Sequence, residues 1–146
     1  MVFQVQPPTN QFCYLLNISE PQLVDINFSK TIYDYNLGIF VDARDKEEFD
    51  IGHIKGAINI PYEIDDNYNV ELLDSIMNEI IMNEKSSVVY CGGDGCTLGE
   101  DLVYYLYEEK YFFSLLYFEE GYPEWKKINY PTTLPKYNST NEKAKY

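Results

Sequence analysis

Short apolar runs that stop at polar residues recur along the chain, and they restrict its fold more than any other feature. Residues 37–44 (LGIFVDAR) and 87–91 (SVVYC) are apolar and rich in β-branched or aromatic side chains, which suits strands buried on both sides of a sheet. Between them, residues 70–83 have helical periodicity. Their apolar positions include Leu72, Leu73, Ile76 and Ile80. This alternation predicts an α/β fold with a parallel sheet covered by helices on both faces.

Weaker signals predict the remaining elements. Ser19 is a good N-cap and Pro21 suits a first turn, so they predict a short helix at 18–26. Gly52 should end a short helix that covers 46–52. We also expect strands at 56–61 and 112–118, a helix from about 98 to 110 and a closing helix at 122–128.

A chain of 146 residues suits one domain, and we place its boundaries by composition. Residues 1–17 should form an N-terminal arm, 18–131 the folded domain and 132–146 a polar C-terminal tail. No targeting signal and no apolar run long enough to span a membrane is visible. A count of 3 cysteines favours reduced thiols, so we expect a cytoplasmic protein.

The net charge of −13 restricts the partners. Nucleic acids and anionic membrane surfaces are bound by positive charge, so we expect neither as a partner. The acidic surface could instead favour a basic protein partner, although such a surface more often only keeps a protein soluble.

The candidate functional segment is VVYCGGDGCTLGEDL, residues 88–102, in which Cys91 ends a predicted strand. Ligands of parallel sheets bind at this edge. Glycine-rich loops let backbone N–H groups turn inward around an anion, and TLGE at 97–100 is a capping-box pattern that predicts a helix start. A thiol aimed at a helix N-terminus should have a lowered pKa and act as a nucleophile. Burial of a small residue would explain Cys91 alone; the glycines and the helix start favour function.

Three motifs resemble the rhodanese family of sulfurtransferases. They are VDARDKEEFDIGHIKGAINIP at 41–61, VVYC at 88–91 and FEEGYPEW at 118–125, and the likeness extends over about residues 18–131. The resemblance implies a parallel sheet of about five strands. It also implies that Cys91 accepts sulfane sulfur as a persulfide and passes it to a thiol or to cyanide.

The loop departs from the resembled family at one important point. The family has a basic residue in the loop, whereas CGGDGCT has none, and Cys96 stands near that position. Anion binding should then depend on the helix dipole and on the backbone between Cys91 and the helix. The expected substrate-binding residues are Gly92, Gly93, Asp94, Gly95 and Thr97. We expect a persulfide donor to be a better substrate than dianionic thiosulfate.

Cys96 has two interpretations. It can attack a persulfide on Cys91, release reduced sulfur and form a disulfide, or it can simply fill space under the loop. Two other chemistries fit poorly. A cysteine phosphatase needs an arginine where Thr97 stands, and two cysteines with the distant His53 are too few for zinc. We therefore expect no metal and no cofactor.

Other polar residues near the motifs favour structural roles. Arg44, the only arginine, should pair with Asp42, Glu47 or Glu48, and the only histidine, His53, should be structural. The expected core and rim residues are Phe118, Tyr122 and Trp125. Cys13 lies outside every motif.

Three functions remain from the sequence. The first is a sulfurtransferase that uses a sulfur donor and a thiol acceptor, either of which can be a protein. The second is a non-catalytic binding module with the same fold. The third is a thiol redox sensor that uses Cys91 and Cys96.

Overall fold

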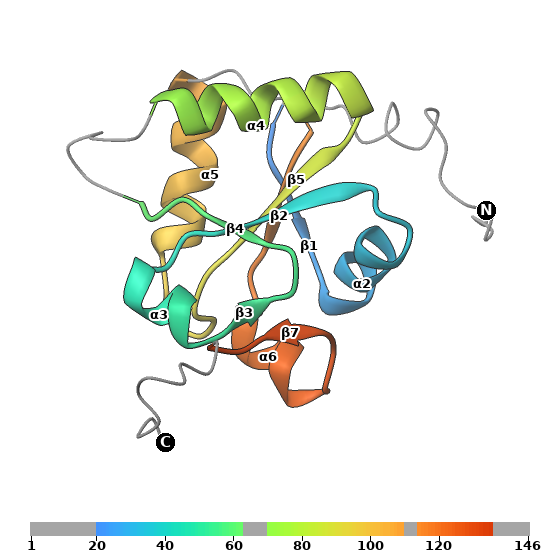
Figure 1. Ribbon diagram of the computed structural model, residues 1–146, viewed down its shortest axis with the longest axis vertical. Coiled ribbons are helices and arrows are strands. Elements are labelled where there is room, and N and C mark those ends of the chain that lie inside the picture. The colour runs from blue at the N-terminus through green and yellow to red at the C-terminus, as the bar shows by residue number, and fades with distance from the viewer. Residues whose placement is uncertain (1–19, 63–69, 110–113, 136–146) are drawn as a thin grey trace, which may run out of the picture.

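The computed structural model describes residues 20–62, 70–109 and 114–135, and its centre is a five-stranded sheet (Figure 1). The strand order is β1-β6-β5-β2-β4, and every neighbouring pair is parallel. The strands are β1 (Gln22–Val24), β2 (Gly38–Asp42), β4 (Ile58–Asn59), β5 (Ser86–Tyr90) and β6 (Leu115–Phe118). The predicted parallel α/β architecture is confirmed.

Helices cover both faces of this sheet (Figure 1). The helices α4 (Val70–Asn83) and α5 (Leu98–Glu109) lie on one face. The opposite face packs against α2 (Ile26–Asp34) and α6 (Gly121–Lys127). The short α3 (Lys46–Ile51) follows β2, beyond the carboxyl edge of the sheet.

The alternation of side chains along the strands divides the core into two clusters. Val41 and Val89 point to the α4–α5 side, where the cluster is mostly aliphatic. Phe40 and Tyr90 point to the α2–α6 side, where Trp125 is fully buried. The Trp125 ring packs at 5.6 Å from the ring of Phe40, and its Nε1–H donates to the carbonyl of Pro131 at 2.7 Å. The expected core position of Trp125 is thus observed.

The predicted helix at 18–26 is wrong. Gln22–Val24 is the edge strand β1, which pairs with β6 through Gln22↔Leu116 and Val24↔Phe118. The helix α2 begins only at Ile26, and its N-cap is Asp25, whose carboxylate accepts from the Phe28 N–H at 2.8 Å. Pairing with a distant strand has overridden a local capping signal. The sequence analysis also missed α2, which buries few apolar residues.

The predicted polar tail begins too early. Thr132–Thr133 forms β7, which pairs with β3 (His53–Ile54) in a separate antiparallel sheet. Next to this pairing, the Lys55 N–H donates a further hydrogen bond to the Pro131 carbonyl. The fold therefore extends at least to Thr133. The arm at 1–17, Cys13 and residues 136–146 lie outside the described residues.

The other predicted elements agree with the structure to within a few residues. The observed ranges are 38–42, 46–51, 58–59, 70–83, 86–90, 98–109, 115–118 and 121–127. Residues 112 and 113 of the predicted strand lie outside the described part of the chain. Across that described part, no helix has the length and apolar character needed to cross a bilayer.

Candidate active site

Cys91 directly follows β5 at the carboxyl edge of the sheet and is only 1% exposed. Two backbone donors fix it. The Gly99 N–H, in the first turn of α5, donates to the Cys91 Sγ at 3.3 Å, and the Tyr122 N–H donates to the Cys91 carbonyl at 3.0 Å. The sulfur therefore lies at the N-terminus of α5, where backbone dipoles favour negative charge.

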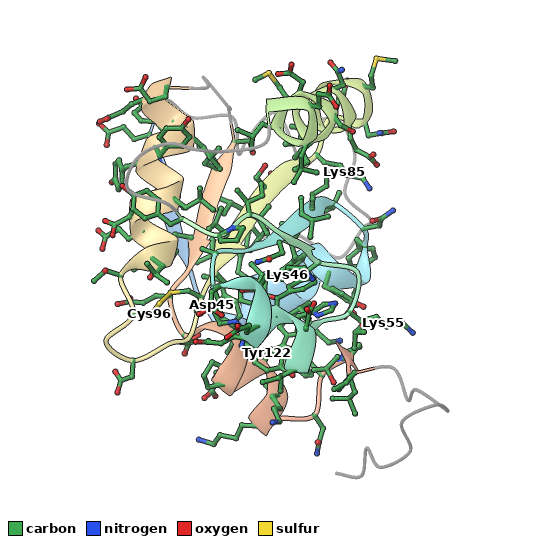
Figure 2. The ribbon with its side chains drawn as sticks, turned by 60° about the vertical axis from the view of Figure 1, so that its left-hand side comes forward. Asp45, Lys46, Lys55, Lys85, Cys96 and Tyr122 are labelled. Carbon is green, nitrogen blue, oxygen red and sulfur yellow. A yellow bond between two sulfur atoms is a disulfide. The ribbon has the colours of Figure 1, made fainter. Side chains whose placement is uncertain are left out.

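Cys91 and Cys96 form a disulfide, with their Cα atoms 6.5 Å apart. Figure 2 shows Cys96 on the loop between β5 and α5, close to the start of that helix. The sequence analysis expected reduced thiols, so the oxidised pair is a difference. The loop reverses direction through a hydrogen bond from the Cys96 N–H to the Gly93 carbonyl at 2.8 Å, and this turn brings the two cysteines together.

Two glycines join the cysteine loop to the turn before α6. Gly93 and Gly121 have φ values of 85° and 69°, which side chains other than glycine rarely adopt. A Cβ on Gly121 would lie 2.5 Å from the Cys91 carbonyl oxygen, and one on Gly93 would lie 2.9 Å from the Glu120 carbonyl oxygen. In the sequence analysis, Gly121 stood only within the motif at 118–125. Its contact with Cys91 becomes visible only in three dimensions.

Gly99 is a second site residue that the sequence analysis missed. A Cβ there would lie 2.7 Å from the Tyr117 ring and 3.4 Å from the Cys91 Sγ. Only glycine lets the first turn of α5 approach the sulfur this closely without moving Tyr117. The glycine two residues after Thr97, inside the predicted capping box, was the available signal.

The expected binding loop surrounds the disulfide. Asp94, Gly95 and Thr97 are exposed, whereas Gly93 is buried and Gly92 is half-buried. Within the loop, the Cys96 N–H donates to the carbonyl of the buried Gly93. The assignment of these residues to substrate binding stays a prediction.

Arg44 forms a buried ion pair. Its Nη2 donates to the Asp42 Oδ2 at 2.6 Å and to the Gly52 carbonyl at 2.7 Å, and its guanidinium lies 4.5 Å from the centre of the Tyr122 ring. Glu48 is a weaker partner at 3.9 Å. Burial alone would lower the pKa of Arg44, but the hydrogen bonds and charge of Asp42 raise it above its ordinary value. Arg44 thus stays charged and paired beside the loop.

Tyr90 extends this buried network to β3. Its hydroxyl accepts the Ile54 N–H at 3.1 Å. Burial, followed by the negative charge of Asp42, raises the pKa of Tyr90 well above its ordinary value. The phenol is therefore neutral at physiological pH, and it contributes a hydrogen bond rather than a charge.

His53 also lies in a structural setting. Its Nδ1 is 2.8 Å from the Phe49 carbonyl oxygen, and its ring stacks on the Phe49 ring with centroids 3.6 Å apart. Neither contact involves Cys91. In the described segments, no group of three or more His, Cys, Asp or Glu side chains is arranged to hold a metal ion.

Acidic residues surround the candidate site. Burial raises the pKa of Tyr117, and the charges of Glu119, Glu100 and Asp101 raise it further. Glu100 and Asp101 lie in the first turn of α5, directly after Gly99, and Glu119 directly follows β6. Asp94 adds an exposed carboxylate within the loop. The site is therefore electronegative.

The fold and the cysteine loop define a class: a parallel α/β protein with a cysteine at the carboxyl edge of its central strand, facing a helix N-terminus. The model of the rhodanese-like domain family matches residues 19–128. The chain belongs to this family.

One curated protein has a similar segment. The HTH-type transcriptional regulator Rv0324 of Mycobacterium tuberculosis is 38% identical over 63 residues, which cover 43% of this chain and 24% of that protein. The chain thus matches about a quarter of that relative's length.

Solved structures share the fold at low sequence identity. The BH2092 protein of Bacillus halodurans is 24% identical with a TM-score of 0.60, and the match covers 77% of this chain and 76% of that chain. A thiosulfate sulfurtransferase from Pseudomonas aeruginosa is 15% identical with a TM-score of 0.59, over 80% of this chain and 21% of that chain. An As-Sb reductase from Leishmania major is 14% identical with a TM-score of 0.57, over 75% and 79%. These similarities establish the fold alone.

Proposed function

We propose that the protein is a rhodanese-type sulfurtransferase in which Cys91 carries sulfane sulfur as a persulfide. The observation that carries the proposal is the position of Cys91, which directly follows the central strand β5 and whose Sγ accepts the Gly99 N–H at the start of α5. Once reduced, this sulfur would bear its negative charge where a backbone donor and the helix dipole stabilise it.

The transfer requires no net oxidation. The Cys91 thiolate attacks the outer sulfur of a donor persulfide, the donor S–S bond breaks, and the donor thiolate leaves and takes up a proton. An acceptor thiolate then attacks the outer sulfur of the Cys91 persulfide. The acceptor becomes a persulfide and the Cys91 thiolate is restored.

The charges around Cys91 favour a persulfide over thiosulfate as the donor. Arg44 is paired with Asp42, so it offers little charge to a bound dianion, while Asp94 and the carboxylates near Tyr117 repel one. A neutral or protein-bound persulfide avoids this repulsion. We expect these partners to be met in the cytoplasm, without nucleic acid or membrane.

Cys96 supplies a second outcome for the bound sulfur. Its thiolate attacks the inner sulfur of the Cys91 persulfide, hydrosulfide leaves, and a Cys91–Cys96 disulfide forms. The disulfide in the structure supports this reach. The same observation favours a second candidate function, a redox sensor in which an oxidant joins the two thiols without any sulfur transfer.

Mass spectrometry of the reduced protein tests the proposal. Wild type, Cys91→Ser and Cys96→Ser are treated separately with thiosulfate, with glutathione persulfide and with hydrogen peroxide, and peptide mapping separates Cys13 from the loop. We expect persulfide donors to add one sulfur atom at Cys91, with a longer lifetime in Cys96→Ser. Absence of added sulfur in both wild type and Cys96→Ser would reject sulfur transfer. If peroxide alone then forms a disulfide, the result would favour the redox sensor. If no treatment changes the mass of the protein, the result would favour a non-catalytic binding module.

A further inference from the structure

We propose that the Cys91–Cys96 disulfide is reopened by a thiol that attacks Cys96, and that the acidic surroundings select neutral or cationic thiols. The natural reductant would then be a protein dithiol with a basic surface. This inference rests on the proposed function and deepens it, since it names the class of partner that returns Cys91 to its thiolate form.

Burial decides which sulfur an incoming thiol can reach. Cys91 is 1% exposed, with Gly99 against its Sγ and Gly121 against its carbonyl group. Cys96 is half-buried, and the space beside the neighbouring Gly95 is open, because a Cβ there would meet no atom within 4 Å. Thiol–disulfide exchange depends on which sulfur is accessible. An external thiolate can therefore approach Cys96 far more readily than Cys91.

The same geometry makes Cys91 the better leaving group. Attack on Cys96 places the departing electron pair on the Cys91 Sγ, which accepts the Gly99 N–H at 3.3 Å and lies at the start of α5. Attack on Cys91 would place the charge on the more exposed Cys96 instead. Since a stabilised thiolate leaves faster, access and leaving-group stability favour the same direction.

Charge determines which thiols approach. Carboxylates near the loop include the exposed Asp94 and the residues whose charges act on Tyr117, namely Glu100, Asp101 and Glu119. Cations also lie near the loop: Arg44 is paired with Asp42, Lys46 is paired with Asp50 at 2.8 Å, and the Lys126 Nζ lies 6.0 Å from the centre of the Tyr122 ring. Figure 2 shows Lys46 on α3, on the same side of the molecule as Cys96. An anionic thiol therefore meets repulsion that a cationic thiol does not.

The reaction balances with a dithiol as the reductant. Its first thiolate attacks the Cys96 Sγ, the Cys91–Cys96 bond breaks, and Cys91 leaves as a thiolate. A mixed disulfide now joins Cys96 to the reductant. The second thiolate of the reductant attacks its own sulfur in that bond and releases the Cys96 thiolate. Two electrons pass from the dithiol to this protein, and the dithiol becomes a disulfide.

The direction of attack can be read by trapping the mixed disulfide. The oxidised full-length protein is mixed briefly with mercaptoethanol, quenched with acid, alkylated and mapped by peptide mass spectrometry. We expect the mercaptoethanol adduct on Cys96 and the alkyl label on Cys91, in at least about tenfold excess over the reverse arrangement. Equal amounts, or an adduct mainly on Cys91, would overturn the direction of attack.

Salt dependence tests the selection by charge. The rate of disulfide opening is measured with cysteamine, mercaptoethanol and mercaptopropionate, which are cationic, neutral and anionic. Raising the salt concentration should slow cysteamine and accelerate mercaptopropionate, each several-fold, and leave mercaptoethanol unchanged. A common salt trend for all three thiols would contradict the proposed selection.

A matched pair of variants locates the charge. Asp94→Asn should slow cysteamine about twofold relative to mercaptoethanol, as expected for one unit charge several ångströms from the sulfur in water. The control is Asp74→Asn, an exposed carboxylate on α4, a helix that lies at the far end of α5 from the loop (Figure 1). Equal effects of both variants would reject local steering.

Failure of this inference differs from failure of the proposed function. If mild oxidation never joins Cys91 to Cys96 in wild type, the reductant step is rejected, while a persulfide on Cys91 in Cys96→Ser would still support sulfur transfer. If the disulfide forms and opens at Cys96 but no donor adds sulfur, the reductant step stands and the transferase proposal falls.

Discussion

The neighbouring strands β2 and β5 end side by side, paired at Asp42↔Tyr90, yet the residues that follow them are held in opposite ways. Beyond β2, charged side chains hold the chain: Arg44 binds Asp42 and the Gly52 carbonyl. Beyond β5, the backbone holds it. The N–H groups of Gly99 and Tyr122 donate to the sulfur and the carbonyl of Cys91.

On the proposed function, this difference gives a site without a loop arginine another way to stabilise a thiolate. The arginine next to the site is saturated by its own carboxylate, so it acts as structure. The cysteine instead receives partial charges from peptide groups, which do not titrate at physiological pH. Variants at the two strand ends should therefore fail in different ways.

The largest expected effect is at the end of β2. Arg44→Ala should lower the free energy of unfolding by about 3–5 kcal/mol, because it leaves the buried Asp42 carboxylate without its partner. Urea denaturation measures the loss. The exposed Lys46–Asp50 pair is the control, and Lys46→Ala should cost no more than about 0.5 kcal/mol. Similar losses in both variants would contradict a structural role for Arg44.

At the end of β5, the addition of a single methyl group should lower the stability of the protein. Gly121→Ala should cost about 3 kcal/mol, because a Cβ would lie 2.5 Å from the Cys91 carbonyl oxygen on a backbone with φ of 69°. Gly95→Ala is the matched control with φ of 78° and open space, and should cost about 1–2 kcal/mol. Thermal and urea unfolding would measure the loss of stability in both variants. Equal losses would mean that the contact between Gly121 and the Cys91 carbonyl is unimportant.

The disulfide should stabilise the loop end of β5 further. For cysteines 5 positions apart, closing the small loop stabilises the protein by about 2 kcal/mol in the chain-entropy account. The wild type should therefore unfold at a higher urea concentration when oxidised than when reduced. Cys96→Ser should show the same midpoint with and without reductant, and a shift in that variant would assign the effect elsewhere.

The smallest effect concerns the network that joins the two strand ends. Tyr90→Phe should cost about 1–2 kcal/mol at neutral pH, because it leaves the buried Ile54 N–H without an acceptor. Burial raises the pKa of Tyr90 in the folded protein, whereas the unfolded chain ionises near pH 10. The contribution of Tyr90 is therefore complete below about pH 10 and falls as the pH rises above it.

Unfolding measured from pH 8 to 11 checks this sign. The gap in stability between wild type and Tyr90→Phe should narrow at the alkaline end, since the variant lacks the phenol. A gap that widens with pH would show that the folded protein ionises Tyr90 more easily than the unfolded chain does.

The sequence alone predicts elements whose signals are local. The β-branched and aromatic run at 88–90 and the helical period of 70–83 could be recognised without their packing partners, and the predicted strand and helix are both observed. The edge strand β1 has no such local signal, because it contains only three residues and forms a strand only by pairing with β6. Ser19 and Pro21 misled the prediction for that reason.

The site divides in the same way. The glycine-rich loop and the coming helix identify Cys91, and the family motif identifies the Asp42–Arg44 turn. The sequence does not reveal that Gly99 donates to the sulfur or that Gly121 packs on the Cys91 carbonyl. Those contacts depend on how α5 and α6 settle on the sheet, which no local pattern encodes.

The pairing of β1 with β6 also limits when the central sheet can be completed during translation. The strand β1 is translated roughly 5–20 s before its neighbour in the sheet, Leu115–Phe118. Gly121 and Tyr122, which hold the Cys91 carbonyl, follow later still. A nascent chain therefore carries its cysteine loop unfinished until Gly121 and Tyr122 have been translated, so the nucleophile is assembled only after the last strand of the central sheet.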